Sequence, residues 1–178
     1  YIFWPADLKI ALDIIPFVTW LLSLVGLVAL VIYDIRWMLL PNRVVFPLLG
    51  LSVASIAVQA LLSSEPLGLI LNALGGLAVA GGIFYVLFQI SGGKWIGGGD
   101  VKLGFVLGLL LASPAKAFLM LFIASILGII VSLPTLITHK SKLTSRIPFG
   151  PFLITATIIV MLFGQSIIDW YSSTFLYL

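Results

Sequence analysis

Six apolar segments, separated by short polar stretches, constrain this chain more than any other feature of its sequence. They are residues 16–33, 44–62, 67–90, 101–112, 117–137 and 149–168. All but the fourth have about the 17–25 residues that a helix needs to cross a bilayer. The pattern predicts an all-α, polytopic membrane protein with about six transmembrane helices, one of them short.

The composition supports lipid as the solvent for most of the surface. Of the 178 residues, 62% are hydrophobic and only 8% are charged, whereas soluble domains carry about 25% charged residues. The chain has no cysteine, which excludes disulfides, thiolate zinc sites and a cysteine nucleophile. A soluble fold is therefore excluded, and any catalysis must use other side chains.

The basic residues indicate how the segments are oriented. Most lie in three alternate connections, and these are Arg36, Arg43, Lys94, Lys102, Lys140, Lys142 and Arg146. The opposite connections hold Glu65 and Lys116. The positive-inside rule places the first set in the cytoplasm, although such residues can also serve only to contact anionic lipid. We expect residues 1–15 to form an external or interfacial segment and residues 16–178 one transmembrane domain.

The segment 101–112 is too short to cross the bilayer as a helix. Its twelve residues extend about 18 Å, against a hydrocarbon core of about 30 Å. If its far end reaches the outer surface, Asp100 lies below the cytoplasmic boundary, where irregular backbone must be buried by protein or reached by water. We therefore expect a hydrated recess beside Asp100, unless the helix is longer or tilted and Lys116 extends to the interface.

Two of the six acidic residues, Asp34 and Asp100, lie at cytoplasmic ends of apolar segments. An ionisable side chain in a membrane domain indicates function, and each aspartate is the obvious partner for the other. Two neighbouring carboxyls do not both ionise easily, so one keeps a proton. In aspartic proteases the ionised member activates water and the protonated member polarises the scissile carbonyl. The pair predicts a peptidase that needs no metal.

Helix polarity suggests how the pair divides its roles. Asp34 is expected near the C-terminal end of its helix, where a negative charge is disfavoured, and Asp100 near an N-terminal end, where it is favoured. We expect Asp100 to be the ionised base and Asp34 the protonated acid, although a coupled pair does not always permit such an assignment. The single histidine, His139, is interpreted as a loop residue.

Glycines surround Asp100 on both sides. The three before it are Gly97, Gly98 and Gly99. Without side chains they would let a substrate backbone approach closely, or they form only a flexible turn. Gly104 and Gly108 follow Asp100 on the same helical face, and small residues permit close packing in membranes. We expect this face to pack against the Asp34 helix, and "GGLAVAGG" at 75–82 to be a second packing face.

Prolines predict turns at the membrane surface. Pro41 forces Leu40 out of helical geometry, so the chain must turn at Pro41 and Asn42, a short distance after Asp34. The segment "IPFGPF", residues 147–152, has the same effect before the last apolar segment. These turns are either plain helix breaks or part of the wall of the recess.

Two segments, "DIRWMLLPNRVVFPLL" and "GGGDVKLG", together resemble the membrane domain of the type IV prepilin peptidases, which are intramembrane aspartyl proteases of the GxGD type. The resemblance extends from about residue 16 to residue 152. It implies that Asp34 and Asp100 are the catalytic pair. It also implies that Gly97 and Gly99 belong to the GxGD signature, and Lys102 matches a lysine usual in the family.

The resemblance also implies a substrate and a location. Enzymes of this family remove the short basic leader of type IV prepilin or pseudopilin precursors at the cytoplasmic face of the bacterial inner membrane. Proteolysis needs no cofactor, and lipid rather than nucleic acid is the expected partner. Many members also methylate the new N-terminus with S-adenosylmethionine, using an N-terminal region that often carries Cys-x-x-Cys pairs. This chain is expected to be a protease-only form or to follow a missing N-terminal region.

Two other classes of function remain open from the sequence. The aspartates could form the relay of a proton-coupled transporter, or they could be a buried pair in a non-catalytic component of pilus or secretion assembly. A transporter would need carboxylates along a path through the bilayer. Both aspartates lie on one side, and segments 44–62, 67–90 and 117–137 contain no acidic residue.

Overall fold

The computed structural model describes residues 11–138 and 148–175. Within these ranges the regular structure is entirely helical, which confirms the all-α prediction. The elements are α1 (Ala11–Trp37), α2 (Asn42–Leu62), α3 (Pro66–Leu77), the π-helical turn η1 (Ala78–Gly82), α4 (Ile83–Ser91), α5 (Gly98–Leu111), α6 (Pro114–Thr138) and α7 (Gly150–Phe175). The expected loop residues His139, Lys140, Lys142 and Arg146 lie outside the described residues.

Five of these helical segments are long and apolar enough to cross a membrane. They are Phe17–Trp37, Asn42–Leu62, Pro66–Ser91, Pro114–Leu133 and Gly150–Phe175. The third comprises α3, η1 and α4, so one expected span is a helix interrupted by a π turn. α1 begins at Ala11, earlier than the expected start of the first span. The proposed division at residue 15 stays a prediction.

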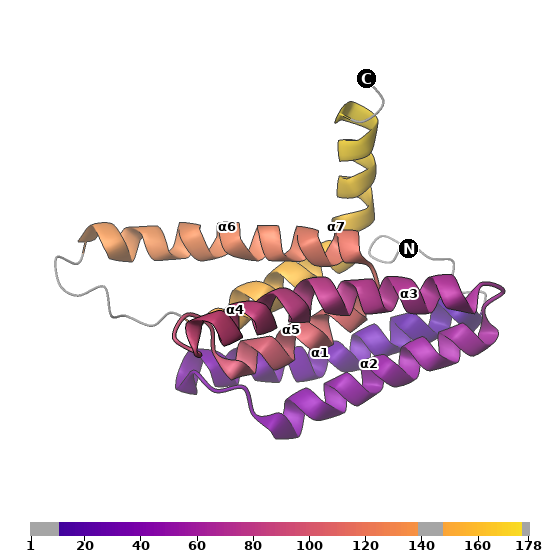
Figure 1. Cartoon of the computed structure of the whole chain (residues 1–178), viewed down its shortest axis with the longest axis horizontal. Coiled ribbons are helices and arrows are strands. Elements are labelled where there is room, and N and C mark those ends of the chain that lie inside the picture. Colours follow the sequence, from indigo (N-terminus) through magenta and orange to yellow (C-terminus); the bar gives the residue numbers. More distant parts are fainter. Residues whose placement is uncertain (1–10, 139–147, 176–178) are drawn as a thin grey trace.

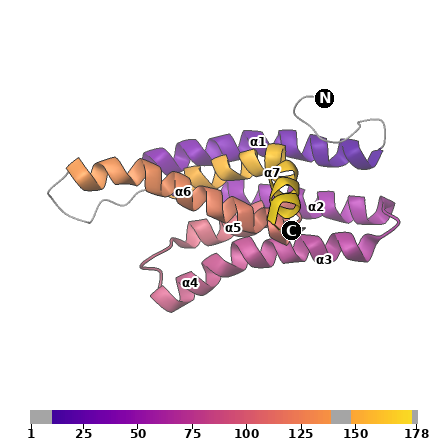
Figure 2. The same cartoon turned by 90° about the horizontal axis from the view of Figure 1, so that it is seen from above.

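The short helix α5 lies at the centre of the bundle. It contacts α2, α3, η1, α4, α6 and α7, and the perpendicular views of Figures 1 and 2 show it enclosed by its neighbours. The sequence explains this position, because after Lys102 every residue of α5 is apolar or glycine, and a helix that is hydrophobic all round is buried rather than exposed on one face. Leu103, Val106 and Leu107 have no exposed surface.

The small-residue face of α5 packs against α3 and η1. A Cβ atom on Gly104 would lie 2.9 Å from the carbonyl oxygen of Ala80, and one on Gly108 would press on the backbone of Gly76. The two small-residue faces expected from the sequence therefore pack against each other. The expectation that this face meets the Asp34 helix is wrong. Spacing along a helix shows which residues share a face, but it does not show which helix covers that face.

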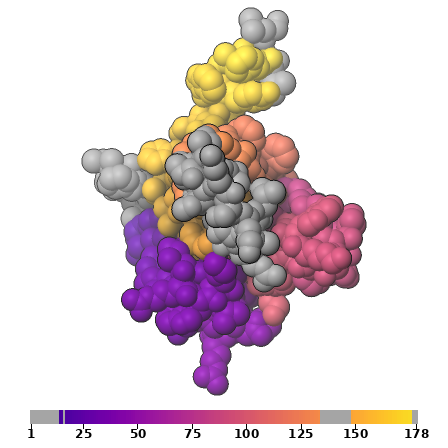
Figure 3. Space-filling view, turned by 90° about the vertical axis from the view of Figure 1, so that its left-hand side faces the viewer, coloured from indigo at the N-terminus to yellow at the C-terminus, as the bar shows by residue number. Residues whose placement is uncertain are grey.

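Basic residues that we expect on the cytoplasmic side lie together at one end of the bundle, as far as the structure describes them. The turns α1–α2 and α4–α5 both lie at the left of Figure 1, and they or their flanks carry Arg36, Arg43, Lys94 and Lys102. Figure 3 looks onto this end, with α1 and α2 on one side and α4 on the other. The α2–α3 turn with Glu65 lies at the far end.

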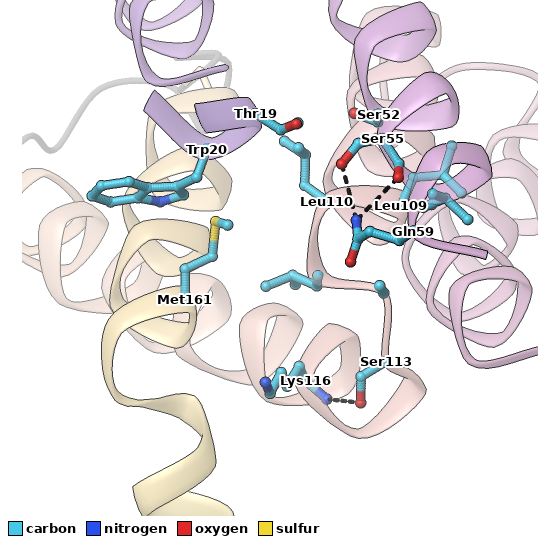
Figure 4. A pocket seen from close by; sticks show the side chains of 13 residues that line it. Thr19, Trp20, Ser52, Ser55, Gln59, Leu109, Leu110, Ser113, Lys116 and Met161 are labelled. Carbon is cyan, nitrogen blue, oxygen red and sulfur yellow. Dashed lines mark hydrogen bonds between the residues drawn. The ribbon is translucent and has the colours of Figure 1, made fainter. Parts of the chain in front are cut away.

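Because α5 is short, it also leaves space at the far end of the bundle. α5 ends at Leu111, and Ala112, with a φ of 45°, turns the chain into α6. A partly polar cavity of about 320 Å³ lies there, between α1, α2, α7 and this turn. Figure 4 shows Thr19, Ser52, Ser55, Gln59, Ser113 and Lys116 around it. The sequence predicted a recess only at the end that carries Asp100.

Candidate active site

Asp34 lies near the C-terminal end of α1 and is buried, with only 5% of its surface exposed. Its Oδ2 atom accepts a hydrogen bond of 3.0 Å from the backbone N–H of Gly150, the first residue of α7. α1 ends three residues later, and Met38 just beyond it has a φ of 50°. The carboxyl is thus placed between the C-terminal end of its own helix and the N-terminal end of α7.

Asp100 lies in the first turn of α5, three residues after the N-cap Gly97. The backbone N–H of Asp100 donates to the carbonyl oxygen of Gly97 at 3.0 Å, and a Cβ atom on Gly97 would lie 3.3 Å from Oδ2 of Asp100. Asp34 and Asp100 line the same two hollows, so the two acidic groups are neighbours.

Two hollows meet at the aspartates. The larger has a volume of about 760 Å³ and lies between the α1–α2 turn and the start of α5. The smaller has a volume of about 540 Å³ and extends toward the α4–α5 turn and the start of α7. Asp34, Met38, Gly97 and Asp100 line both. A substrate in either hollow would therefore lie beside both carboxyls.

Every candidate residue from the sequence lines the larger hollow. These residues are Asp34, Pro41, Asn42, Gly97, Gly98, Gly99, Asp100 and Lys102. They come from two parts of the chain that the fold brings to one place. Their proximity agrees with a shared function, while the role of each stays a prediction.

The α1–α2 turn is fixed onto the start of α5 by two contacts. A Cβ atom on Gly99 would lie 3.3 Å from the Leu40 side chain, so the glycine allows the turn to approach closely. Lys102 donates from Nζ to Oδ1 of Asn42 at 2.9 Å. The same ammonium lies 5.8 Å from the centre of the Phe46 ring. Asn42 and Lys102 therefore join the walls of the larger hollow.

Sequence reasoning missed Gly150. It recognised "IPFGPF" as a turn, and the structure places Pro148 and Phe149 of that segment in the wall of the smaller hollow. It did not anticipate that the next residue contacts Asp34. The local sequence places this glycine between an aromatic residue and a proline at a helix start. That pattern marks the position but does not show which residue it contacts.

Two aspartates from separate helices lie beside a glycine turn in this bundle, and a pair of neighbouring carboxyls is the arrangement that aspartic proteases use. A family model described as the type IV leader peptidase family matches residues 21–133. The chain belongs to this family. Its helices and its bacterial relatives make it a multi-pass bacterial membrane protein.

Three relatives that carry the name prepilin leader peptidase/N-methyltransferase illustrate the similarity. The protein from Aeromonas salmonicida (strain A449) is 33% identical over 151 residues, covering 84% of this chain and 50% of the relative. That from Bacillus subtilis (strain 168) is 33% identical over 166 residues, covering 91% and 61%. That from Legionella pneumophila is 32% identical over 152 residues, covering 85% and 52%. The chain thus spans about half the length of most of these relatives. No solved structure gives a significant match.

Proposed function

We propose that this chain is an endopeptidase that removes the basic leader from type IV prepilin or pseudopilin precursors. The observation that carries the proposal is that Asp34 and Asp100, from different helices, line the same two hollows. Family membership supports the same reaction. The names of the relatives support prepilin precursors as the substrate.

The proposed chemistry uses the two carboxyls as one unit. One ionised carboxyl takes a proton from water, and the protonated partner donates a hydrogen bond to the scissile carbonyl. The hollows beside the carboxyls have room for the water and for the peptide bond that it attacks. The backbone N–H group of Gly150 donates to Oδ2 of Asp34, which holds the orientation of that carboxyl. Our assignment of the proton to Asp34 rather than Asp100 remains part of the proposal.

The proposed location is the cytoplasmic face of the bacterial inner membrane. Arg36, Arg43, Lys94 and Lys102 lie at the end of the bundle that holds the aspartates. Basic residues mark the cytoplasmic side of membrane proteins. This agrees with cleavage of a leader that has not crossed the membrane.

The names of the relatives also include N-methyltransferase. In the family that the chain resembles, methyl transfer uses S-adenosylmethionine and an N-terminal region. We assign none of the described residues to that reaction. The proposal for this chain is therefore limited to proteolysis, for which it invokes no cofactor.

A proton-coupled transporter is the main alternative, and it would need polar groups along a path through the bundle. The far cavity in Figure 4 is partly polar, but buried apolar side chains lie between it and the aspartates along α1 and α5. On α1, Leu27 and Leu30 precede Asp34 and have 1% and 0% of their surfaces exposed. On α5, Leu103 and Leu107 have none. This layer favours the peptidase.

The test is to reconstitute the purified chain in liposomes with a full-length prepilin precursor. We expect release of the leader, detected by mass spectrometry at a single new terminus. A pH-sensitive dye inside the same liposomes reports proton flux. Proton flux without cleavage would replace the proposal with a transporter, and the absence of both would favour a non-catalytic assembly component.

The contact between Asn42 and Lys102 gives a milder prediction. We expect Asn42→Ala to lower kcat/KM roughly 5-fold, because a hydrogen bond to a charged group contributes about 1.5–3 kcal/mol and this one is exposed, which lowers its contribution. The loss should appear in precursor cleavage kinetics. Asn72→Ala, at an exposed asparagine on α3, is the matched control and should leave kcat/KM unchanged. Equal activity of both variants would contradict a role for this contact.

A further inference from the structure

The start of α7 and the end of α1 meet at a single hydrogen bond between residues 116 positions apart. Gly150 donates its backbone N–H to Oδ2 of Asp34 at 3.0 Å, in a buried setting. A Cβ atom built on Gly150 would lie 2.5 Å from that same oxygen and 3.2 Å from the carboxyl carbon. The N–H group of Gly150 therefore donates to the same Asp34 oxygen that a side chain at position 150 would strike.

We propose that Gly150 is a positioning residue for Asp34, and that a glycine is required there because any side chain would displace the carboxyl. As a role in catalysis, the inference rests on the proposed peptidase function. The structural part of the inference, that Gly150 and Asp34 are coupled, does not depend on that function. Its two consequences can be measured separately.

The hydrogen bond also distinguishes the two oxygens of Asp34. Oδ2 is occupied by the Gly150 N–H group, and a donor facing that oxygen disfavours a proton on it. Oδ1 is left for water, substrate or Asp100. When Asp34 carries the shared proton, the proton therefore resides on Oδ1. The contact thus sets which oxygen reacts, in addition to holding the side chain in place.

The beginning of α7 is itself held firmly. The Phe149 ring packs edge-to-face on Phe84, with ring centres 6.1 Å apart, and on Phe152 at 6.2 Å. Pro151 follows Gly150 in the first turn, where its fixed φ favours a helix start. Because these contacts fix the helix start, the N–H group of Gly150 has a fixed direction. If this segment served only to break the helix, it would not require a glycine at position 150.

The first experiment is a double-mutant cycle on stability, which requires no peptidase activity. We expect Gly150→Ala to lower the Tm of the purified protein, because the added methyl group meets the Asp34 carboxyl. In an Asp34→Ala background, the carboxyl is gone, so adding Gly150→Ala should cost little or no Tm. Such non-additivity is the signature of direct coupling. An equal loss of Tm in both backgrounds, or no loss in either, would overturn the inference.

The second experiment separates kcat from KM in precursor cleavage. A displaced catalytic group costs about 100-fold in rate for a shift of about 1 Å, so we expect Gly150→Ala to lower kcat by about that factor with KM little changed. Gly68→Ala is the matched control. Gly68 also lies in the first turn of a helix with a proline near its start, and nothing lies within 4 Å of its Cβ position.

The outcomes of the two experiments are distinct. Unchanged kcat in a folded Gly150→Ala protein, or a loss equal to that of Gly68→Ala, would refute the positioning role. If the unmodified chain cleaves no precursor, the proposed function fails, and the stability cycle still decides whether Gly150 and Asp34 are coupled.

Discussion

The Asp34→Asn and Asp100→Asn variants are each expected to lose leader release by at least about 10³-fold, because groups that act as a unit fail together. An amide can neither accept a proton from water nor share one with its partner. The shape of the side chain is kept, and in Asp34→Asn the new amide oxygen can still accept the N–H bond that Asp34 Oδ2 accepts from Gly150. The fold should therefore persist, with a Tm close to that of the unmodified protein.

A control and a combined variant make this prediction specific. Asp169→Asn removes an exposed carboxyl that accepts a hydrogen bond from Gln165, far along α7 from its start at Gly150, and it should leave kcat unchanged. The double variant Asp34→Asn/Asp100→Asn should be no less active than either single variant. Residual cleavage above about one tenth of the original in both single variants would show that the aspartates do not act as the unit described.

The second large effect is expected from Gly104→Leu. Its Cβ atom would lie 2.9 Å from the Ala80 carbonyl oxygen and 3.2 Å from the Cα atom of Gly81. Both are backbone atoms, so α5 must move away from η1. Overpacking of this kind costs about 3 kcal/mol or more when backbone must shift. We expect a clear loss of stability and, because Asp100 lies one turn away, a fall in kcat.

Gly50→Leu on α2 is the matched control for that prediction, because nothing lies within 4 Å of the Cβ position of Gly50. Thermal unfolding of both variants in the same detergent measures the difference in stability. Equal Tm values for Gly104→Leu and the unmodified protein would show that α5 and η1 are not in close contact.

Much of the candidate site could be predicted because its signals are local. Charge at the end of an apolar segment is costly, which identified Asp34 and Asp100 without any knowledge of the fold. The proline at position 41 predicted the turn that the structure has between α1 and α2. Apolar length alone predicted the long spans and the short apolar segment after Asp100, which the structure contains in α5.

The remaining features depend on which elements meet, and local patterns do not contain that information. The glycine face of α5 was recognised, but its partner was not. Helix polarity in α1 alone puts Asp34 at an end that disfavours its charge. The structure adds the N-terminal end of α7, where the N–H group of Gly150 faces the carboxyl and the dipole favours negative charge. A neighbour 116 residues away cannot be read from spacing.

The most direct test of the shared proton is infrared spectroscopy of the purified protein with ¹³C-labelled aspartate carboxyls, at neutral pH. We predict one protonated carboxyl band in the unmodified protein, and its loss in both Asp34→Asn and Asp100→Asn, because the remaining aspartate no longer has a charged partner. A band that is absent from the unmodified protein, or one that survives unchanged in both variants, would contradict the account.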